Sequence, residues 1–269
     1  MKLLMDLYKI DSPSGHEDDM ISFITSYLDR INVGYWTDEL GNIYAAKGVS
    51  KHYPCLVSHM DEVHVNKPRG YKPVNFKGEV VFGYDTYRKN FIGIGADDKN
   101  GIWICLKSLK RAEVLKCVFF VQEEVGRIGS GRCEMSFFDD CRFVLQCDRK
   151  GNSDFINSID GTDLCSEEFM YDALSRSYGY SESHGLVTDV YTLKRRGLKV
   201  SCANISCGYY NPHTADEYTR VGDLRKCLRL VTNIIEKCTK VYHHTFSPRR
   251  HRHYNQPWNP FGRDWDEIF

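Results

Sequence analysis

The sequence predicts an α/β protein, a three-layer α/β/α sandwich around a mixed, mostly parallel central sheet. Short, uninterrupted apolar runs occupy residues 54–58, 117–121 and 143–147, and such runs suit strands that are buried on both faces. A polar cluster follows each run, and segments with helical spacing lie between the runs. Strands that alternate with helices in this way are typical of a parallel sheet covered by helices on both sides.

The N-terminal part is predicted to contain a helix and a hairpin. Residues 16–31 place apolar side chains at helical spacing, and Ser14 with Glu17 three residues later matches a capping box at the start of that helix. Two short segments, 34–36 and 42–46, flank the turn sequence DELGN. Because their side chains alternate in polarity, we expect them to pair as a β-hairpin.

The rest of the chain continues with helices and strands in alternation. Residues 101–112 form a predicted helix with Ile102, Leu106 and Leu109 on one face, and residues 117–121 lead into a glycine-rich turn. Further along, the sequence predicts a helix, a strand and a long final helix, at 162–179, 199–206 and 220–242. The apolar stripe of the final helix indicates packing on the core. We therefore expect a single domain over residues 1–243.

The last residues have a different composition. Between 244 and 269 the helical periodicity is lost, and Pro, Arg, His and aromatic residues accumulate. This is typical of a flexible tail or of a segment that folds only against a partner. His251 and His253 could recruit a metal there, although such tails usually remain solvated.

The charge balance argues against a general nucleic-acid binder or membrane-surface binder. Among 269 residues, 36 Lys and Arg balance 36 Asp and Glu, so the formal net charge is zero and the pI is near 7.1. No apolar stretch of about 18 residues occurs, and the N-terminus lacks the apolar core of a signal peptide. We expect a cytoplasmic protein.

The cysteines indicate reduced thiols. Eleven are present, most of them inside apolar runs, and none are in Cys-x-x-Cys spacing. The odd number without an export signal predicts small buried side chains in place of disulfides. The spacing also argues against a structural zinc ribbon.

Five polar clusters follow the apolar segments, where the carboxyl ends of strands are expected. They contain, in order, His59 and Asp61, Asp97 and Asp98, Glu123 and Glu124, Cys147 and Asp148, and His213. Ligands bind at this edge of open α/β sheets, and His with carboxylate donors suits zinc, or less well cobalt or manganese. One carboxylate that bridges two metals would hold them about 3.5–4 Å apart. Each cluster alone is most often a turn or a solvated surface, but five in this order indicate a metal site.

Six segments carry a resemblance to a known family: SPSGHE (12–17), HMDEV (59–63), GADDKNG (95–101), QEEVG (122–126), CDRKG (147–151) and NPHTADEY (211–218). The chain resembles the co-catalytic zinc metallopeptidases of the aminoacylase, peptidase T and carboxypeptidase G group, and their leucine and glutamyl aminopeptidase relatives. The matching segments span most of the chain outside the tail. The motifs HxD, GADDK and EEVG in this order are the specific part of the resemblance.

The resemblance implies two zinc ions held by five residues. His59 and Asp148 would bind one ion, Glu124 and His213 would bind the other, and Asp97 would bridge the two.

The resemblance also implies roles for neighbouring residues. Asp61 would accept the imidazole N–H of His59 and so set its tautomer. Glu123 would be the general base, which takes a proton from the attacking water and later passes it to the leaving amine. Asp98 would follow a cis peptide bond. If the preceding strand persisted, the side chains of Glu123 and Glu124 would point in different directions.

The chain differs from relatives that carry a lid or dimerisation domain as a large insertion. Only 65 positions separate Asp148 from His213, and only 36 separate Asp61 from Asp97. We therefore expect a lid-free, single-domain form. Loop residues must then line the pocket, and the candidates, each more often an ordinary surface residue, are His64, Arg69, His184 and Asp189.

The function implied by the resemblance is hydrolysis of an amide bond, most of all by an aminopeptidase acting on peptides. Alternatives on the same fold are deacylation of N-acyl amino acids, a carboxypeptidase-like amidohydrolase and glutaminyl cyclisation. An alternative of another class is a non-hydrolytic metal-binding protein that holds a partner. The presence of Glu123 argues against that last alternative, because a binding protein has no need of a base.

Overall fold

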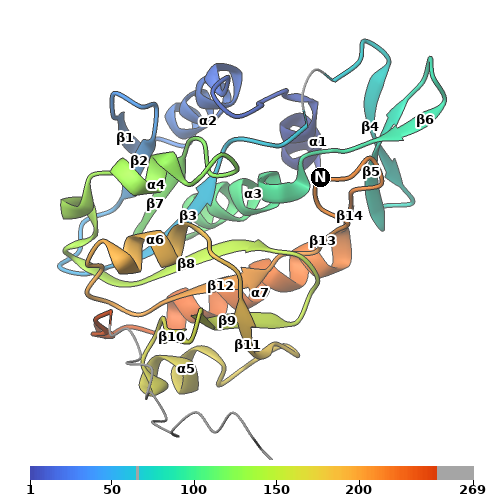
Figure 1. Cartoon of the computed structure of the whole chain (residues 1–269). Coiled ribbons are helices and arrows are strands. Elements are labelled where there is room, and N and C mark those ends of the chain that lie inside the picture. Colours follow the sequence, from blue (N-terminus) through green and yellow to red (C-terminus); the bar gives the residue numbers. More distant parts are fainter. Residues whose placement is uncertain (65–66, 247–269) are drawn as a thin grey trace, which may run out of the picture.

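The chain folds around a nine-stranded sheet, and a smaller five-stranded sheet lies beside it (Figure 1). The computed structural model describes residues 1–64 and 67–246, so the predicted tail from residue 247 onward, with His251 and His253, lies outside the described residues. The large sheet consists of β1 (Gly34–Thr37), β2 (Ile43–Lys47), β3 (Tyr53–His59), β7 (Leu115–Phe120), β8 (Cys141–Arg149), β9 (Asp154–Ile159), β10 (Thr162–Asp163), β11 (Ser181–Gly185) and β12 (Cys202–Ser206). The helices are α1 (Lys2–Lys9), α2 (Asp18–Arg30), α3 (Ala96–Arg111), α4 (Ile128–Arg132), α5 (Glu167–Ala173), α6 (Asp189–Arg195), α7 (Val221–Lys237) and the 3-10 helix η1 (Met135–Phe138).

The large sheet is mixed and has a parallel centre, as predicted. Its order is β1-β2-β7-β3-β8-β12-β9-β10, with β11 pairing to β9. Strand β3 runs parallel to β7 and β8, and β12 runs parallel to β8. At one edge β1 and β2 form the predicted hairpin, in which Gly34 pairs with Ala46. The carboxyl ends of the central strands therefore meet at one edge of the sheet.

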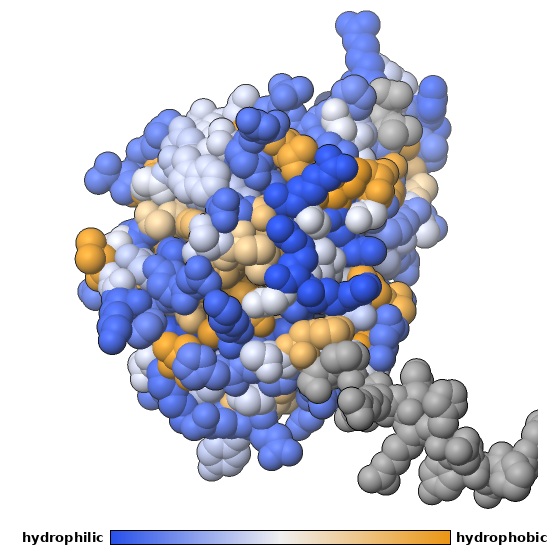
Figure 2. Space-filling model, turned by 60° about the vertical axis from the view of Figure 1, so that its left-hand side comes forward, coloured by the Kyte–Doolittle hydropathy of each residue, from blue (hydrophilic) through white to orange (hydrophobic). Residues whose placement is uncertain are grey.

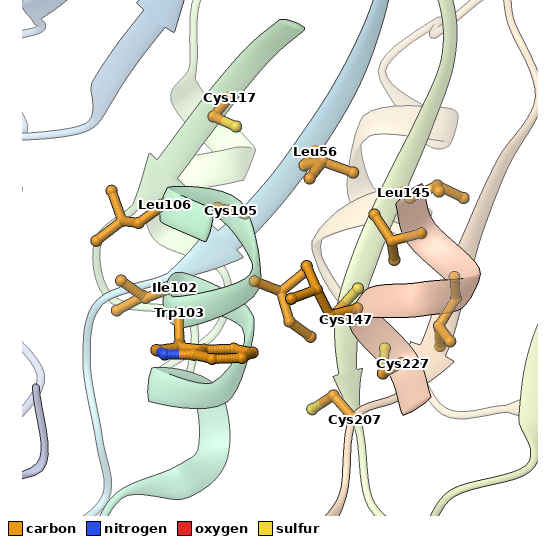
Figure 3. Close-up of a cluster of buried hydrophobic side chains, with 14 of the residues drawn as sticks. Leu56, Ile102, Trp103, Cys105, Leu106, Cys117, Leu145, Cys147, Cys207 and Cys227 are labelled. Atoms are coloured by element: carbon orange, nitrogen blue, oxygen red, sulfur yellow. The ribbon is translucent and has the colours of Figure 1, made fainter. Parts of the chain in front are cut away.

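Helices cover both faces of the large sheet, which confirms the predicted three layers. Along β3, Leu56 packs into the core formed with α1, α2, α3, α5 and α7, whereas Cys55 and Val57 pack into the opposite core with α6. Figure 3 shows the first core between the sheet and helices α3 and α7, in which Leu56 and Leu145 of the strands lie between the two helices.

The cysteines agree with the sequence analysis, and the visible surface is mostly hydrophilic. All eleven cysteines are buried and free. Hydrophilic side chains cover most of the face in Figure 2, and hydrophobic side chains form separate patches between them. Within residues 1–64 and 67–246, every helix is too short or too polar to cross a membrane.

The segment between Asp61 and Asp97 contains strands that the sequence analysis did not anticipate. Strands β4 (Tyr71–Phe76), β5 (Val80–Asp85) and β6 (Asn90–Ile92) join β13 (Tyr209–Tyr210) and β14 (Tyr218–Arg220) in the small sheet. Most of their side chains are partly or fully exposed, so no uninterrupted apolar run marks them. The apolar run before Asp97 is a strand only at β6, in this small sheet. Asp97 itself lies in the first turn of α3.

Two local predictions were wrong. The capping box is not formed, because Ser14 Oγ donates to Asp61 Oδ2 at 2.7 Å and Glu17 Oε1 accepts the backbone N–H of Gly15 at 3.0 Å. The helix expected over 162–179 is confined to α5. Its first residues, Thr162 and Asp163, instead form the short strand β10, which pairs with β9.

Candidate active site

His59 lies at the carboxyl end of β3, the centre of the large sheet, and its side chain is 1% exposed. Its Nε2 is 3.2 Å from Asp97 Oδ1 and 3.8 Å from Asp148 Oδ1. Its Nδ1 is 3.2 Å from Asp61 Oδ1 and 3.1 Å from the Asp61 carbonyl oxygen. One ring nitrogen therefore faces two carboxylates while the other is held by Asp61, as the sequence analysis expected.

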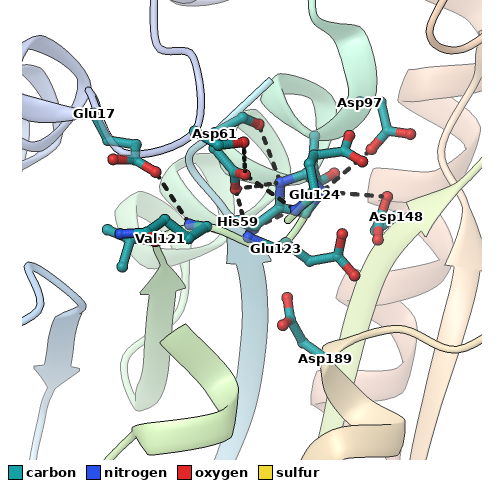
Figure 4. A network of polar contacts seen from close by, with 12 residues as sticks. Glu17, His59, Asp61, Asp97, Val121, Glu123, Glu124, Asp148 and Asp189 are labelled. Carbon is teal, nitrogen blue, oxygen red and sulfur yellow. Dashed lines mark hydrogen bonds and ion pairs between the residues drawn. The ribbon is translucent and has the colours of Figure 1, made fainter. Parts of the chain in front are cut away.

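Asp97 lies between the two predicted histidines. While its Oδ1 faces His59, its Oδ2 is 3.4 Å from His213 Nε2, and that nitrogen is also 3.0 Å from Glu124 Oε1. The fold thus brings all five predicted ligands together, with Asp148 beside His59 and Glu124 beside His213. Figure 4 shows how His59, Asp97, Glu124 and Asp148 converge. The His213 side chain is 49% exposed and lies at the mouth of the cluster.

The first turn of α3 places two neighbouring acids differently. The peptide bond between Asp97 and Asp98 is cis. Asp98 is fully buried, and its carboxylate accepts the backbone N–H of His59 at 3.3 Å and that of Gly101 at 3.0 Å. Its carboxylate also lies near His59 and Asp148. Asp98 therefore holds the end of β3 against α3, a role for which the sequence carried no signal.

Asp61 also holds the turn that carries Glu123 and Glu124. Its carboxylate accepts the backbone N–H groups of Glu123 at 2.8 Å and Glu124 at 3.0 Å. Strand β7 has already ended at Phe120, and Gln122 has a φ of 54°. The two glutamates consequently differ in direction because of a turn, and the expected alternation along a strand was wrong.

Carboxylates crowd the site, and their pKa values reflect it. The pKa of Glu123 is raised to about 9, chiefly by burial and further by the charges of Asp189 and Asp148. Burial also raises the pKa of Glu124 to about 6. The hydrogen bond with Asp97 raises the pKa of His213 to about 9. Positive charge placed among these groups would relieve the repulsion that raises the carboxylate pKa values.

The donor set fits a divalent cation. His59, Asp97 and Glu124 offer ligand atoms that lie within 4.8 Å of one another. Imidazole nitrogens and carboxylate oxygens are the donors that zinc takes in open sites, and manganese or cobalt also accept them. Because the carboxylates are negatively charged and close together, a cation would satisfy them better than the two imidazoles alone.

Gln146 and Asp189 lie behind the predicted ligands and support them, and the sequence analysis missed Gln146. Gln146 is fully buried in β8, and its Nε2 donates to Asp148 Oδ2 and to Asp189 Oδ2, each at 3.1 Å. Its Oε1 accepts the backbone N–H of Val190 at 3.1 Å, which ties α6 to the site. Alternation along β8 places Gln146 on the same face as Asp148, and this was the available signal.

A cavity of about 430 Å³ opens beside the cluster. Its walls include Asp97, Glu123, Glu124, Asp148, His213, Tyr209, Asn204, Arg127, Arg149, Lys150 and residues 185–188. None of the four predicted pocket residues, His64, Arg69, His184 and Asp189, is among these walls. His64 is hydrogen-bonded to Glu217, His184 contacts Ser158, and Asp189 lies behind Glu123. The segment between His184 and Asp189 does reach the cavity, through Gly185 to Thr188.

Comparisons with known proteins give short sequence matches and extensive structural ones. No protein-family model matches the chain. A LysW-lysine/LysW-ornithine hydrolase of Pyrobaculum aerophilum is 39% identical over 82 residues, which are 30% of this chain and 23% of that protein. Its counterpart from Pyrococcus abyssi is 31% identical over 83 residues, 31% of this chain and 23% of that protein. The chain thus matches less than a quarter of the length of these relatives.

Solved aminopeptidase structures match nearly the whole chain. Aminopeptidase PepT of Bacillus cereus has a TM-score of 0.68 at 14% identity, covering 88% of this chain and 97% of that one. A tripeptidase of Staphylococcus aureus has a TM-score of 0.69 at 16% identity, covering 88% and 97%. A TET aminopeptidase from a Thaumarchaeota archaeon reaches 0.70 at 14% identity, covering 88% and 96%. The chain has the fold of these aminopeptidases.

Proposed function

We propose that the chain is a metal-dependent hydrolase of amide bonds, and specifically an aminopeptidase that acts on peptides with two zinc ions. The observation that carries this proposal is the position of Asp97, whose two carboxylate oxygens face His59 on one side and His213 on the other. A single carboxylate between two imidazoles is the arrangement expected of a shared ligand. Residues 1–243 would form the catalytic domain and would work without a separate lid domain.

Five side chains would hold the cations. His59 and Asp148 would bind one, His213 and Glu124 the other, and Asp97 both. Bound there, divalent cations supply positive charge that polarises an amide carbonyl and lowers the pKa of water. Zinc suits these donors best, and cobalt or manganese are the alternatives.

Glu123 is the residue that would move protons. Its carboxyl group points toward Asp148 and Asp189 at the wall of the cavity, and its backbone is fixed by Asp61 (Figure 4). It would accept the proton of the attacking water and return it to the leaving amine. Its neighbour Glu124 faces His213 instead, so the two adjacent glutamates divide proton transfer and cation binding between them.

The printed names of the similar proteins support an amide hydrolase. Two are hydrolases of LysW-lysine or LysW-ornithine, and the structural neighbours are aminopeptidases and a tripeptidase. Deacylation of an N-acyl amino acid, or a carboxypeptidase-like reaction, would use the same residues. A metal-binding protein that only holds a partner would not need a proton acceptor such as Glu123 beside the predicted metal ligands.

The test is reconstitution followed by a substrate panel. Protein stripped by a chelator should be inactive, and activity should return with zinc, cobalt or manganese on aminoacyl-nitroanilides and dipeptides. N-acyl amino acids and Gln-peptides in the same panel separate deacylase and cyclase activity from aminopeptidase activity. An anomalous-scattering map should show two peaks about 3.5–4 Å apart at Asp97. Absence of hydrolysis with every metal and every substrate would exclude the proposed activity.

A further inference from the structure

The cavity beside the cluster is lined by three cationic side chains that the proposed reaction does not use. Arg127, Arg149 and Lys150 share its walls with the carboxylates and His213. If the five predicted ligands bind two divalent cations, the four positive charges of these cations face the carboxylates of Asp97, Glu123, Glu124 and Asp148. The three cationic side chains lie at the walls of the cavity, where their charges can attract an anionic group of a substrate.

Arg127 is held close to the predicted base by the backbone. Its N–H donates to the Glu123 carbonyl oxygen at 2.7 Å, and its φ of 57° lies in the left-handed region that non-glycine residues rarely adopt. The following residue, Ile128, donates to Gln122 at 3.0 Å. The turn that carries Glu123 and Glu124 therefore also fixes where the Arg127 side chain starts.

Lys150 follows Asp148 by two residues at the end of β8. Its carbonyl oxygen accepts Ser206 Oγ at 2.8 Å, so the backbone here is anchored to the neighbouring strand β12. Arg149 is already engaged, with Nε 3.2 Å from Asp154 Oδ2. Arg127 and Lys150, in contrast, form no ion pair with another residue of 1–64 or 67–246. The charge of Arg127 also favours the ionised form of the buried Asp189 carboxylate. Two cations that form no ion pair within these residues therefore flank the cavity, each on a segment that carries a predicted metal ligand.

We propose that Arg127 and Lys150 bind a carboxylate group of the substrate close to the amide bond that is cleaved. This inference rests on the proposed function and names its substrate class: peptides or N-acyl amino acids with a free carboxylate near the scissile bond. A guanidinium presents paired N–H donors that match a carboxylate, and an ammonium adds a point charge. The carboxylate belongs either to the C-terminus of the leaving residue or to an acidic side chain of the acyl residue.

Matched substrate pairs test the proposal. Alanyl-alanine against alanyl-alaninamide varies the C-terminal carboxylate, and glutamyl-p-nitroanilide against glutaminyl-p-nitroanilide varies the side-chain carboxylate. The zinc-loaded protein should prefer the charged member of one pair by about tenfold or more in kcat/KM, the size of one charge-assisted hydrogen bond. The pair that shows this preference identifies which of the two carboxylates is bound.

Substitutions test whether Arg127 and Lys150 cause the preference for the charged substrate. Arg127→Gln and Lys150→Gln should reduce the preference, mainly by raising KM for the charged substrate. The matched controls are Arg132→Gln, an exposed arginine at the end of helix α4, which Arg127 precedes, and Lys199→Gln, an exposed lysine. Both should leave the preference unchanged. Equal hydrolysis of both members of both pairs, or a preference that survives the Arg127→Gln/Lys150→Gln double variant, would overturn the proposal while the hydrolase function stands.

A binding measurement separates this proposal from the proposed function. Calorimetric titration of the same pairs into the Glu123→Gln variant reads the carboxylate contact without turnover. Tighter binding of the charged member, lost in Glu123→Gln/Arg127→Gln, supports the contact whatever the rate of hydrolysis. Equal binding of both members contradicts it, even in a protein that hydrolyses amides.

Discussion

Glu217 holds the backbone that presents Asp97. Its Oε1 accepts the Asp97 N–H at 3.1 Å, and its Oε2 accepts the Gly95 N–H at 2.7 Å and contacts His64 Nε2 at 3.1 Å. The Glu217 side chain is fully buried. Because Glu217 belongs to the same loop as His213, it links the loop of one predicted ligand to the turn of another. The position of Asp97 between the two histidines therefore depends on a residue that touches neither of them.

Replacing Glu217 should weaken metal binding without removing a ligand. In Glu217→Gln one acceptor becomes a donor that faces the N–H groups of Gly95 and Asp97, so the turn must shift. Outer residues that orient ligands typically contribute about 10- to 100-fold in metal affinity. Zinc affinity, measured by competition with a chromophoric chelator, should fall in that range. Asp216→Asn, at the exposed neighbouring position, is the control and should bind as the parent does.

The shared-ligand assignment predicts different metal stoichiometries for two variants. His213→Ala removes a donor from one cation only, so the protein should keep one zinc ion per chain, held by His59 and Asp148. Asp97→Ala removes a donor from both and should leave less than one. Native mass spectrometry or elemental analysis after dialysis gives the ratio. If Asp97→Ala and His213→Ala retain the same amount of metal, Asp97 is not a shared ligand.

Glu123→Gln should keep both metals and lose most of the turnover. The amide cannot accept a proton, and general-base catalysis typically contributes about 10²- to 10⁴-fold. We expect kcat to fall within that range, with metal content unchanged. Glu113→Gln, at an exposed position before β7, is the matched control. Unchanged hydrolysis by Glu123→Gln would remove Glu123 from its proposed role.

Stability should decrease in mild acid because of His244, which lies away from the candidate site. Burial and the nearby Lys194 charge lower its pKa to about 4 from 6.5. A lowered histidine pKa means that folding favours the neutral ring, so its contribution is present above pH 6.5 and is lost as the pH falls toward 4. The His244 side chain is partly exposed, so we expect the free energy of unfolding to fall by about 1 kcal/mol after allowance for screening.

Urea unfolding of the parent and of His244→Gln at pH 7 and pH 5 measures this contribution. Between pH 7 and pH 5 the free energy of unfolding of the parent should fall by about 1 kcal/mol more than that of the variant. Carboxyl groups with raised pKa values, such as Glu124, act in the opposite direction over the same range, but they are common to both proteins and cancel in the difference. An equal pH dependence of the two proteins would contradict the assignment to His244.

The residues of the candidate site were readable from the sequence because of where strands end. His59 and Asp148 follow apolar runs long enough to mark buried parallel strands, and the ends of such strands meet at one edge of a sheet. The strands β4 to β6 were not readable, because short, half-exposed strands lack a continuous apolar pattern. Asp97 was found by its motif, although the strand before it, β6, belongs to the small sheet and Asp97 itself lies in the first turn of helix α3.

The sequence by itself determined the layered α/β class and the order of the polar clusters, since both follow from local periodicity and residue chemistry. The choice of five candidate ligands within those clusters came from the resemblance of their motifs to a known family. Only the tertiary structure decided which buried groups hold them. Glu217 lies 120 positions from Asp97, and Asp61 lies 62 positions from Glu123. Hydrogen bonds between such distant residues depend on how strands and loops pack, and a pattern within one segment does not encode that packing.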